Sequence, residues 1–195
     1  MQLSGKLRPA VFIDRDGVVN SALIRDGKPF APRSINELVV LDGVREAISL
    51  LHEHGFITVV ITNQPDIAHG HTTPEVVFEI HQAISKETGL QNFFTCSHND
   101  QNQCECRKPK IGLIREATRD LDIDIAKSFI VGDRWKDIEA GQRAGCQCFF
   151  IDNNYPEKRP VPPYHTVASL LEAARIIVEG VNAKEFKRFE GKDFR

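Results

Sequence analysis

The chain has 195 residues, of which 41% are hydrophobic and 27% charged, and its formal net charge is -2. This length corresponds to one domain with a substantial core, and the near-neutral charge gives no electrostatic footprint for nucleic acid or an anionic membrane. No apolar stretch approaches the roughly 20 residues of a membrane helix, and no apolar secretory signal begins the chain. We therefore expect a cytoplasmic protein without disulfides among its five cysteines.

Short apolar runs alternate with amphipathic stretches along the chain. In chain order, they predict a strand at 9–13, a helix from Asp42 to Gly55, a strand at 56–61, a helix from Thr73 to Gly89, a strand at 93–94, a helix at 111–121, a strand at 129–131, a helix at 138–144, a strand at 147–151 and a helix at 167–178. This alternation predicts an α/β fold, a Rossmann-like three-layer sandwich with a parallel sheet. We interpret residues 1–181 as a single domain, 182–195 as a charged C-terminal tail and 152–163 as a surface loop.

The first predicted strand runs directly into Asp14-Arg15-Asp16-Gly17. Asp14 and Asp16 project to the same side of the chain, and two carboxylates held this close repel each other unless a cation or a shared proton intervenes. A hard divalent cation such as Mg²⁺, which prefers oxygen ligands, satisfies both, and Gly17 permits a sharp turn after them. The alternative is an ordinary turn in which both aspartates cap backbone amides.

Polar residues also follow the later strands, where a parallel sheet places its ligands. Thr62, beside Asn63 and Gln64, ends the second strand and offers a hydroxyl to a phosphate oxygen, unless it only terminates the strand. Lys108 precedes a helix and offers its positive charge to an anion, although most basic loops are only solvated.

The strand at 129–131 is followed by a further pair of carboxylates. Asp133 comes directly after Gly132 and would complete the cation site that Asp14 begins. Asp137, four residues later, would be either a helix cap or an outer ligand of the same cation. This pair alone is weak support for a site, and it gains weight only beside the other strand ends.

Cysteine and histidine gather in one short segment, at Cys96, His98, Cys104 and Cys106. Three thiolates and one imidazole suit a tetrahedral Zn²⁺, and four protein ligands leave no open position, so such a zinc would be structural. It would cross-link the loop and fix where Lys108 points; the alternative is a loop of unligated cysteines. We interpret the remaining cysteines, Cys146 and Cys148, as buried core residues rather than a second metal pair.

Taken together, these motifs resemble those of the haloacid-dehalogenase superfamily of phosphatases: Asp14–Gly17, Thr62, Lys108, and Gly132–Asp133 with Asp137. The cysteine-rich loop running into Arg107-Lys108-Pro109 resembles the branch that holds the heptose bisphosphate phosphatases and the histidinol-phosphate phosphatases. Residues 62–70 are similar to the heptose branch's Thr-Asn-Gln-x-x-Ile-Ala-x-Gly, but Pro65-Asp66 stands where Ser-Gly is usual.

The resemblance implies a Mg²⁺-dependent phosphomonoester hydrolase. In such an enzyme Asp14 would be the nucleophile that forms an aspartyl-phosphate, and Asp16 would act as general acid and then base. Asp14, the backbone carbonyl of Asp16, and Asp133 would hold Mg²⁺, while Thr62 and Lys108 would hold the phosphoryl oxygens. Substrate contacts are expected from Asn63, Gln64, Arg107 and Arg134.

The expected partner is a small phosphorylated metabolite, with a sugar bisphosphate favoured. The resemblance favours removal of the 7-phosphate of D-glycero-D-manno-heptose 1,7-bisphosphate; the alternatives are histidinol phosphate, a polynucleotide 3'-phosphate end, or a zinc-stabilised interaction protein without turnover. The segments between Asp16, Thr62 and Lys108 are too short for a large cap domain, so we expect an open site covered only by loops such as 20–33 and 66–72. We expect a monomer.

Overall fold

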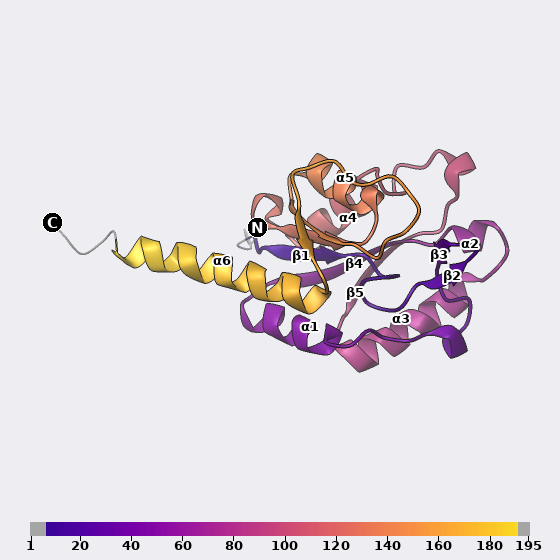
Figure 1. The fold of residues 1–195 in the computed structure, drawn as a ribbon, viewed down its shortest axis with the longest axis horizontal. Helices are drawn as coiled ribbons and strands as arrows, with labels where there is room; N and C mark the ends of the chain where they lie inside the picture. The colour runs from indigo at the N-terminus through magenta and orange to yellow at the C-terminus, as the bar shows by residue number, and fades with distance from the viewer. Residues whose placement is uncertain (1–6, 191–195) are drawn as a thin grey trace, which may run out of the picture.

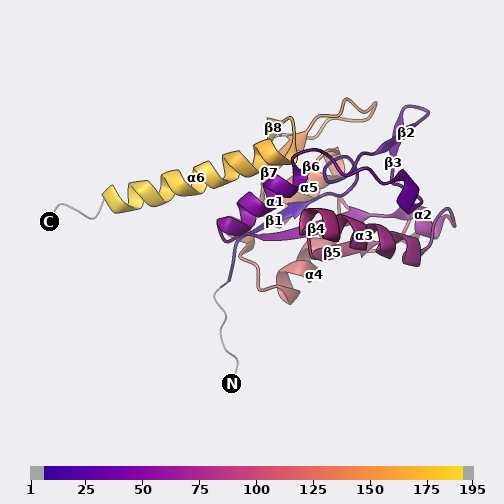
Figure 2. The ribbon, with the colours of Figure 1, turned by 90° about the horizontal axis from the view of Figure 1, so that it is seen from below.

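The computed structural model describes residues 7–190, with the backbone alone for residues 181–190. Its centre is a six-stranded parallel sheet with the order β5-β4-β1-β6-β7-β8 (strands labelled in Figures 1 and 2). The strands are β1 (Ala10–Ile13), β4 (Ile57–Asn63), β5 (Asn92–Cys96), β6 (Phe129–Gly132), β7 (Gln147–Ile151) and β8 (His165–Val167). The predicted parallel sheet is confirmed, and β8 is an edge strand that the apolar pattern did not predict.

Helices cover both faces of this sheet, which gives the predicted three layers (Figures 1 and 2). One face carries α1 (Val44–Glu53), α3 (Pro74–Thr88) and α6 (Leu170–Glu190), and the other carries α4 (Gly112–Asp120) and α5 (Trp135–Ala144). Side chains of β1 alternate between the two cores: Val11 and Ile13 join the first, and Phe12 joins the second. Cys146 and Cys148 are buried in the second core, as predicted.

The predicted starts of α1 and α5 need correction. Asp42 is not the cap of α1, because the left-handed Gly43 (φ 77°) immediately precedes the helix. Helix α5 begins at Trp135, three residues before the predicted start at Ile138, so Asp137 lies in its first turn. The start of α3 is as predicted, since the Thr73 hydroxyl accepts the backbone N–H of Val76.

The predicted start of the last helix, at Val167, is wrong. Val167 ends β8 and pairs with Ile151 of β7, and α6 begins at Leu170. A capping box marks this start: the Ser169 hydroxyl accepts the Glu172 N–H, and the Glu172 carboxylate accepts the Ala168 N–H. The expected tail 182–195 continues this helix as far as Glu190, and residues 191–195 lie outside the described residues.

The expected loop 20–33 contains a hairpin, β2 (Leu23–Arg25) and β3 (Lys28–Phe30), so the prediction of loops alone was wrong here. Asp26 (φ 50°) and Gly27 (φ 74°) form its turn, a dipeptide that favours two-residue hairpins. The hairpin lies near the short helix α2 (Pro65–Ala68) at one end of the sheet (Figure 1).

Three single-turn 3-10 helices complete the described elements, at η1 (Ile35–Glu37), η2 (Asp100–Asn102) and η3 (Ile125–Lys127). Across residues 7–190, none of the helices combines the length and the apolar character needed to cross a bilayer.

Candidate active site

The predicted strand-end residues meet at the carboxyl edge of the sheet. Asp14 follows β1, Thr62 belongs to β4, and Asp133 follows β6; because Ile13 pairs with both Val60 and Val131, these three strands end side by side. Each of the three polar residues is buried. The parallel register therefore brings together residues that are up to about 120 positions apart in the chain.

Lys108 joins this group from the loop between β5 and α4. Its side-chain nitrogen Nζ lies 2.6 Å from Asp14 Oδ1 and 2.7 Å from Asp137 Oδ1, and it donates to the Ile61 carbonyl at 2.8 Å. The residue is only 2% exposed. Burial opposes its charge, but the carboxylates of Asp137 and Asp14 raise the pKa of Lys108, so the ammonium stays charged.

Three carboxylates surround this one ammonium. Oxygens of Asp14, Asp133 and Asp137 lie within 4.8 Å of one another. Burial, and then the charge of Asp137, raise the pKa of Asp14 to about 6, while burial and the charge of Asp14 raise the pKa of Asp133 well above its usual range. Buried carboxylates in this arrangement could hold a divalent cation, because it supplies the positive charge that a single lysine lacks.

One oxygen of Asp133 is placed to bind such a divalent cation. Asp133 Oδ1 is buried without a hydrogen-bond partner among residues 7–190, whereas Asp133 Oδ2 accepts from Asn153 Nδ2 at 3.2 Å. Both oxygens of Asp137 are engaged, one by Lys108 and the other by the backbone N–H of Arg134 at 3.0 Å, which caps α5. Asp133 thus offers a free hard oxygen ligand, and Asp137 mainly anchors Lys108.

Gly17 allows Asp133 to come this close to the first strand end. It has a φ of 96°, and a Cβ on it would lie 1.8 Å from Asp133 Oδ2 and 2.9 Å from the Tyr155 hydroxyl. Its carbonyl accepts from Asn153 Nδ2 at 3.1 Å. Asn153 and Tyr155 come from the 152–163 loop, and no pattern in the sequence marked them as neighbours of the site.

The carboxylate of Asp16 accepts hydrogen bonds from three side chains. Arg15 donates from Nε to Oδ1 and from Nη2 to Oδ2, both at 3.1 Å. Asn20 Nδ2 donates to Oδ1 at 3.0 Å, and Gln64 Nε2 donates to Oδ2 at 2.7 Å. Arg15 and Asn20 were not singled out from the sequence, although Arg15 lies between the two predicted aspartates.

The segment after β4 bonds mainly within the protein. Gln64 is buried and donates to the Thr62 hydroxyl at 2.7 Å, which links Thr62 to Asp16. The Asn63 side-chain amide donates to the Lys108 carbonyl at 3.2 Å and accepts the Lys108 N–H at 3.1 Å. Asn63 therefore fixes the backbone that carries the Lys108 side chain.

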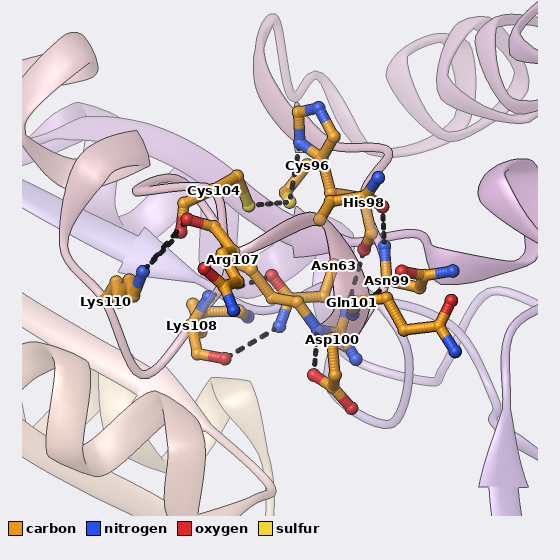
Figure 3. A network of polar contacts seen from close by, with 12 residues as sticks. Asn63, Cys96, His98, Asn99, Asp100, Gln101, Cys104, Arg107, Lys108 and Lys110 are labelled. Carbon is orange, nitrogen blue, oxygen red and sulfur yellow. Dashed lines mark hydrogen bonds and ion pairs between the residues drawn. The ribbon is translucent and has the colours of Figure 1, made fainter.

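The predicted cysteine–histidine cluster is assembled at the end of β5 and in the loop after it, and Figure 3 shows Cys96, His98 and Cys104. Cys106 Sγ lies 3.1 Å from Cys96 Sγ, 3.4 Å from Cys104 Sγ and 3.2 Å from His98 Nδ1. Cys96 Sγ lies 3.7 Å from both His98 Nδ1 and Cys104 Sγ, close to the roughly 3.8 Å between ligands about 2.3 Å from one tetrahedral ion, and the Cys106 separations are shorter. Burial raises the pKa of the Cys106 thiol, so a cation is needed to keep it as a thiolate. The cluster could hold a metal ion.

A cavity of about 590 Å³ opens above these buried residues. Its lining includes Asp14, Asp16 and Lys108 at the base, and above them the hairpin, helix α2, the segment Tyr155–Glu157, Arg107 and Lys136. The arginines are paired with acids: Arg107 Nε with Asp100 Oδ1 at 2.7 Å, and Arg134 Nη2 with Glu157 Oε2 at 2.6 Å. Short segments alone form this border, so there is no large cap among residues 7–190.

Several known proteins are similar to this chain in sequence. Residues 105–173 match the profile of the HAD-hydrolase-like family. The D-glycero-beta-D-manno-heptose-1,7-bisphosphate 7-phosphatase of Haemophilus ducreyi is 33% identical over 150 residues, which cover 71% of this chain and 79% of that protein. The enzyme of the same name from Escherichia coli is 34% identical over 149 residues, which cover 70% of this chain and 74% of that protein.

A solved structure agrees with both sequence matches. The D,D-heptose 1,7-bisphosphate phosphatase of B. bronchiseptica, complexed with magnesium and phosphate, superimposes with a TM-score of 0.74 at 27% identity, covering 88% of this chain and 99% of that chain. The resemblance expected from the motifs is thereby confirmed. The chain belongs to the HAD-like hydrolases, in the family of the D-glycero-beta-D-manno-heptose-1,7-bisphosphate 7-phosphatases.

Proposed function

We propose that this chain is a Mg²⁺-dependent phosphatase that hydrolyses a sugar bisphosphate through an aspartyl-phosphate on Asp14. The observation that carries the proposal is the position of the Asp14 carboxylate, at the base of a cavity and 2.6 Å from the Lys108 ammonium. Lys108 orients the nucleophile and offsets the negative charge that an incoming phosphate adds to the site.

Two proton-coupled steps complete the reaction. In the first, an Asp14 oxygen forms a bond to phosphorus as the ester P–O bond breaks, and Asp16 gives its proton to the leaving alkoxide oxygen. In the second, water attacks the phosphoryl-aspartate, its proton passes to Asp16, and the Asp14 carboxylate is released with inorganic phosphate. Asp16 lines the same cavity as Asp14, as both roles require.

Asp14, Asp133 and the backbone carbonyl of Asp16 would hold Mg²⁺. Bound there, the ion neutralises charge between the carboxylates and the phosphoryl group. The partnerless Asp133 Oδ1 supports this assignment, because a buried carboxylate oxygen without a donor is costly unless a cation meets it. Likewise, we assign Zn²⁺ to Cys96, His98, Cys104 and Cys106 as a structural ion.

The cationic border of the cavity favours a substrate with a second phosphate. Arg107, Arg134 and Lys136 all line it; Asp100 and Glu157 pair with the two arginines, and burial, followed by the Arg107 charge, lowers the pKa of Lys136. A second phosphate would be attracted to these cations, whereas the amino group of histidinol phosphate would be repelled by them. The relatives' named substrate, the 1,7-bisphosphate of D-glycero-beta-D-manno-heptose, has this second phosphate.

Phosphate release from the two candidate substrates tests this assignment. With Mg²⁺, we expect kcat/KM for the heptose 1,7-bisphosphate to exceed that for histidinol phosphate, and ³¹P NMR to show loss of the 7-phosphate. Chelation of Mg²⁺ should stop turnover of both. Preference for histidinol phosphate would replace the substrate assignment but keep the phosphatase, and release from neither would reject the proposed function.

A further inference from the structure

A fully buried guanidinium lies directly behind Asp16. Arg15 is 0% exposed, and two of its nitrogens, Nε and Nη2, donate to the Asp16 carboxylate. Its remaining nitrogen, Nη1, lies 3.1 Å from Nε2 of His81 on α3, 66 residues away in the chain. The guanidinium therefore bridges the predicted acid–base residue and a histidine in the helical layer.

His81 is set up to accept this hydrogen bond. It is buried, and its ring stacks on Phe93 of β5 with centroids 4.5 Å apart and planes 18° apart. Burial, and then the charge of Arg15, lower the pKa of His81 to about 3, so the imidazole is neutral. Because Arg15 can only donate, Nε2 is the acceptor and the ring proton lies on Nδ1.

We propose that His81 is a positioning residue for Asp16: by accepting from Arg15 Nη1, it fixes the planar guanidinium whose other edge holds the Asp16 carboxylate. This inference rests on the proposed function, in which Asp16 is the general acid and base. Without His81 the guanidinium would keep its two bonds to Asp16 but could rotate with it. The orientation of the acid, rather than its presence, would then be lost.

The buried setting makes this acceptor hard to replace. Nη1 lies in a part of the molecule from which water is excluded, so a guanidinium N–H left without a partner there would shift to find one. The Asp16 oxygens, which Arg15 already contacts, also receive Asn20 and Gln64. A shift of Arg15 toward them would displace the carboxylate from its present orientation.

The experiment compares two substitutions of His81 on two leaving groups. His81→Phe keeps an aromatic ring against Phe93 but removes the acceptor, whereas His81→Gln keeps an acceptor oxygen but removes the ring. The two substrates are the heptose 1,7-bisphosphate, whose alkoxide leaving group needs the proton of Asp16, and para-nitrophenyl phosphate, whose phenolate does not. The parameter is kcat/KM, because it reports the steps up to formation of the phosphoryl-enzyme.

We expect His81→Phe to lower kcat/KM for the sugar phosphate about tenfold, a part of what general acid catalysis supplies, and to change that for the aryl phosphate less than twofold. His81→Gln should stay near wild type on both substrates. His52→Phe is the matched control, because it removes a histidine that bonds to Thr58 at the opposite end of the sheet. Equal losses on both substrates, or no loss on either in His81→Phe, would overturn the proposal.

A second readout does not depend on turnover. In NMR spectra of the whole protein, the Arg15 Nη1 protons, which face His81, should be protected from solvent exchange in the wild type and in His81→Gln, and lose that protection in His81→Phe. Unchanged protection in His81→Phe would overturn the positioning role even in an active enzyme. A wild-type protein that releases phosphate from neither substrate would instead reject the proposed function, while the exchange result still decides the role of His81.

Discussion

The site has a floor and a rim that are built in different ways. The floor consists of Asp14, Thr62, Lys108, Asp133 and Asp137, which are buried at the strand ends, where their charges interact with little water between them. The rim consists of the hairpin, α2, η2 and the 152–163 loop, joined by ion pairs such as Arg107–Asp100 that reach solvent. Loss of a floor charge should therefore cost much more than loss of a rim charge, which is screened.

The strongest test of the floor is Asp14→Asn. The amide cannot act as the nucleophile, so we expect kcat to fall by at least about a thousandfold, as when other nucleophiles are removed. Phosphate release measured with unchanged thermal unfolding would separate this loss from misfolding. A variant with near wild-type turnover would contradict the assignment of Asp14.

Lys108→Met should be the next largest change, because it leaves Asp14 and Asp137 without their common counter-ion. We expect about 3 kcal/mol lower unfolding free energy, the usual result of breaking a buried ion pair, and about a hundredfold lower kcat. Urea unfolding and steady-state kinetics measure both. The control is Arg175→Ala, which breaks the exposed pair with Glu46 and should cost less than about 1 kcal/mol. Similar costs for the two variants would erase the distinction between a buried ion pair of the floor and an exposed ion pair.

The loop of Cys96, His98, Cys104 and Cys106, to which we assign Zn²⁺, connects floor and rim, so its disruption should have an intermediate effect. Cys106→Ser should lose the bound zinc and lower kcat/KM about tenfold, as for groups that orient an active site from outside, because Lys108 follows two residues later. Elemental analysis of the purified protein gives the zinc content. Cys146→Ser is the matched control: this cysteine is buried but is not one of the four cluster residues, so its variant should keep zinc. Zinc retained in Cys106→Ser would refute the ligand assignment.

The lowered pKa of His81, which lies behind the floor, predicts that the free energy of unfolding depends on pH. Its pKa is about 3 in the folded protein and 6.5 in the unfolded chain, so below pH 6.5 the unfolded chain binds a proton that the folded protein does not. The contribution of neutral His81 to the free energy of unfolding is therefore fully present above pH 6.5. It falls as the pH drops toward 3, by at most about 1.4 kcal/mol per pH unit. Urea titrations between pH 5 and 7 should show a shallower fall in His81→Phe than in the wild type. The same dependence of unfolding free energy on pH in both proteins would mean that His81 is protonated in the folded protein as readily as in the unfolded chain.

A substitution in the rim should have the smallest effect on activity. Arg33 Nε binds Asp66 Oδ2 at 2.7 Å and so ties the segment after the hairpin to α2. Arg33→Ala should raise KM for the sugar bisphosphate about threefold with kcat nearly unchanged. This change corresponds to the free energy that a partly exposed ion pair usually contributes. Arg25→Ala, which breaks the neighbouring pair with Glu37, is the control and should change KM less. A large fall in kcat in Arg33→Ala would mean that this rim pair orients the floor.

The sequence predicts the floor better than the rim, for a physical reason. Asp14, Thr62 and Asp133 each follow an apolar run, and parallel strands carry such ends to one edge of the sheet, so local patterns suffice. Arg15 and Asn153 act through partners that are 66 and 136 residues away, and no local pattern encodes those contacts. Hairpin and final-helix signals did exist, in Asp26-Gly27 and in Ser169 with Glu172, but apolar periodicity does not detect them.

The position of β1 in the middle of the sheet also governs how the protein folds during synthesis. Val11 pairs with Thr58 on one side and with Phe129 on the other. A nascent chain that ends before β6 therefore leaves one edge of its most buried strand unpaired, and such long-range pairing is slow and prone to aggregation. Asp14 and Asp133 come together only when β6 pairs with β1, so metal binding at the floor would report that pairing.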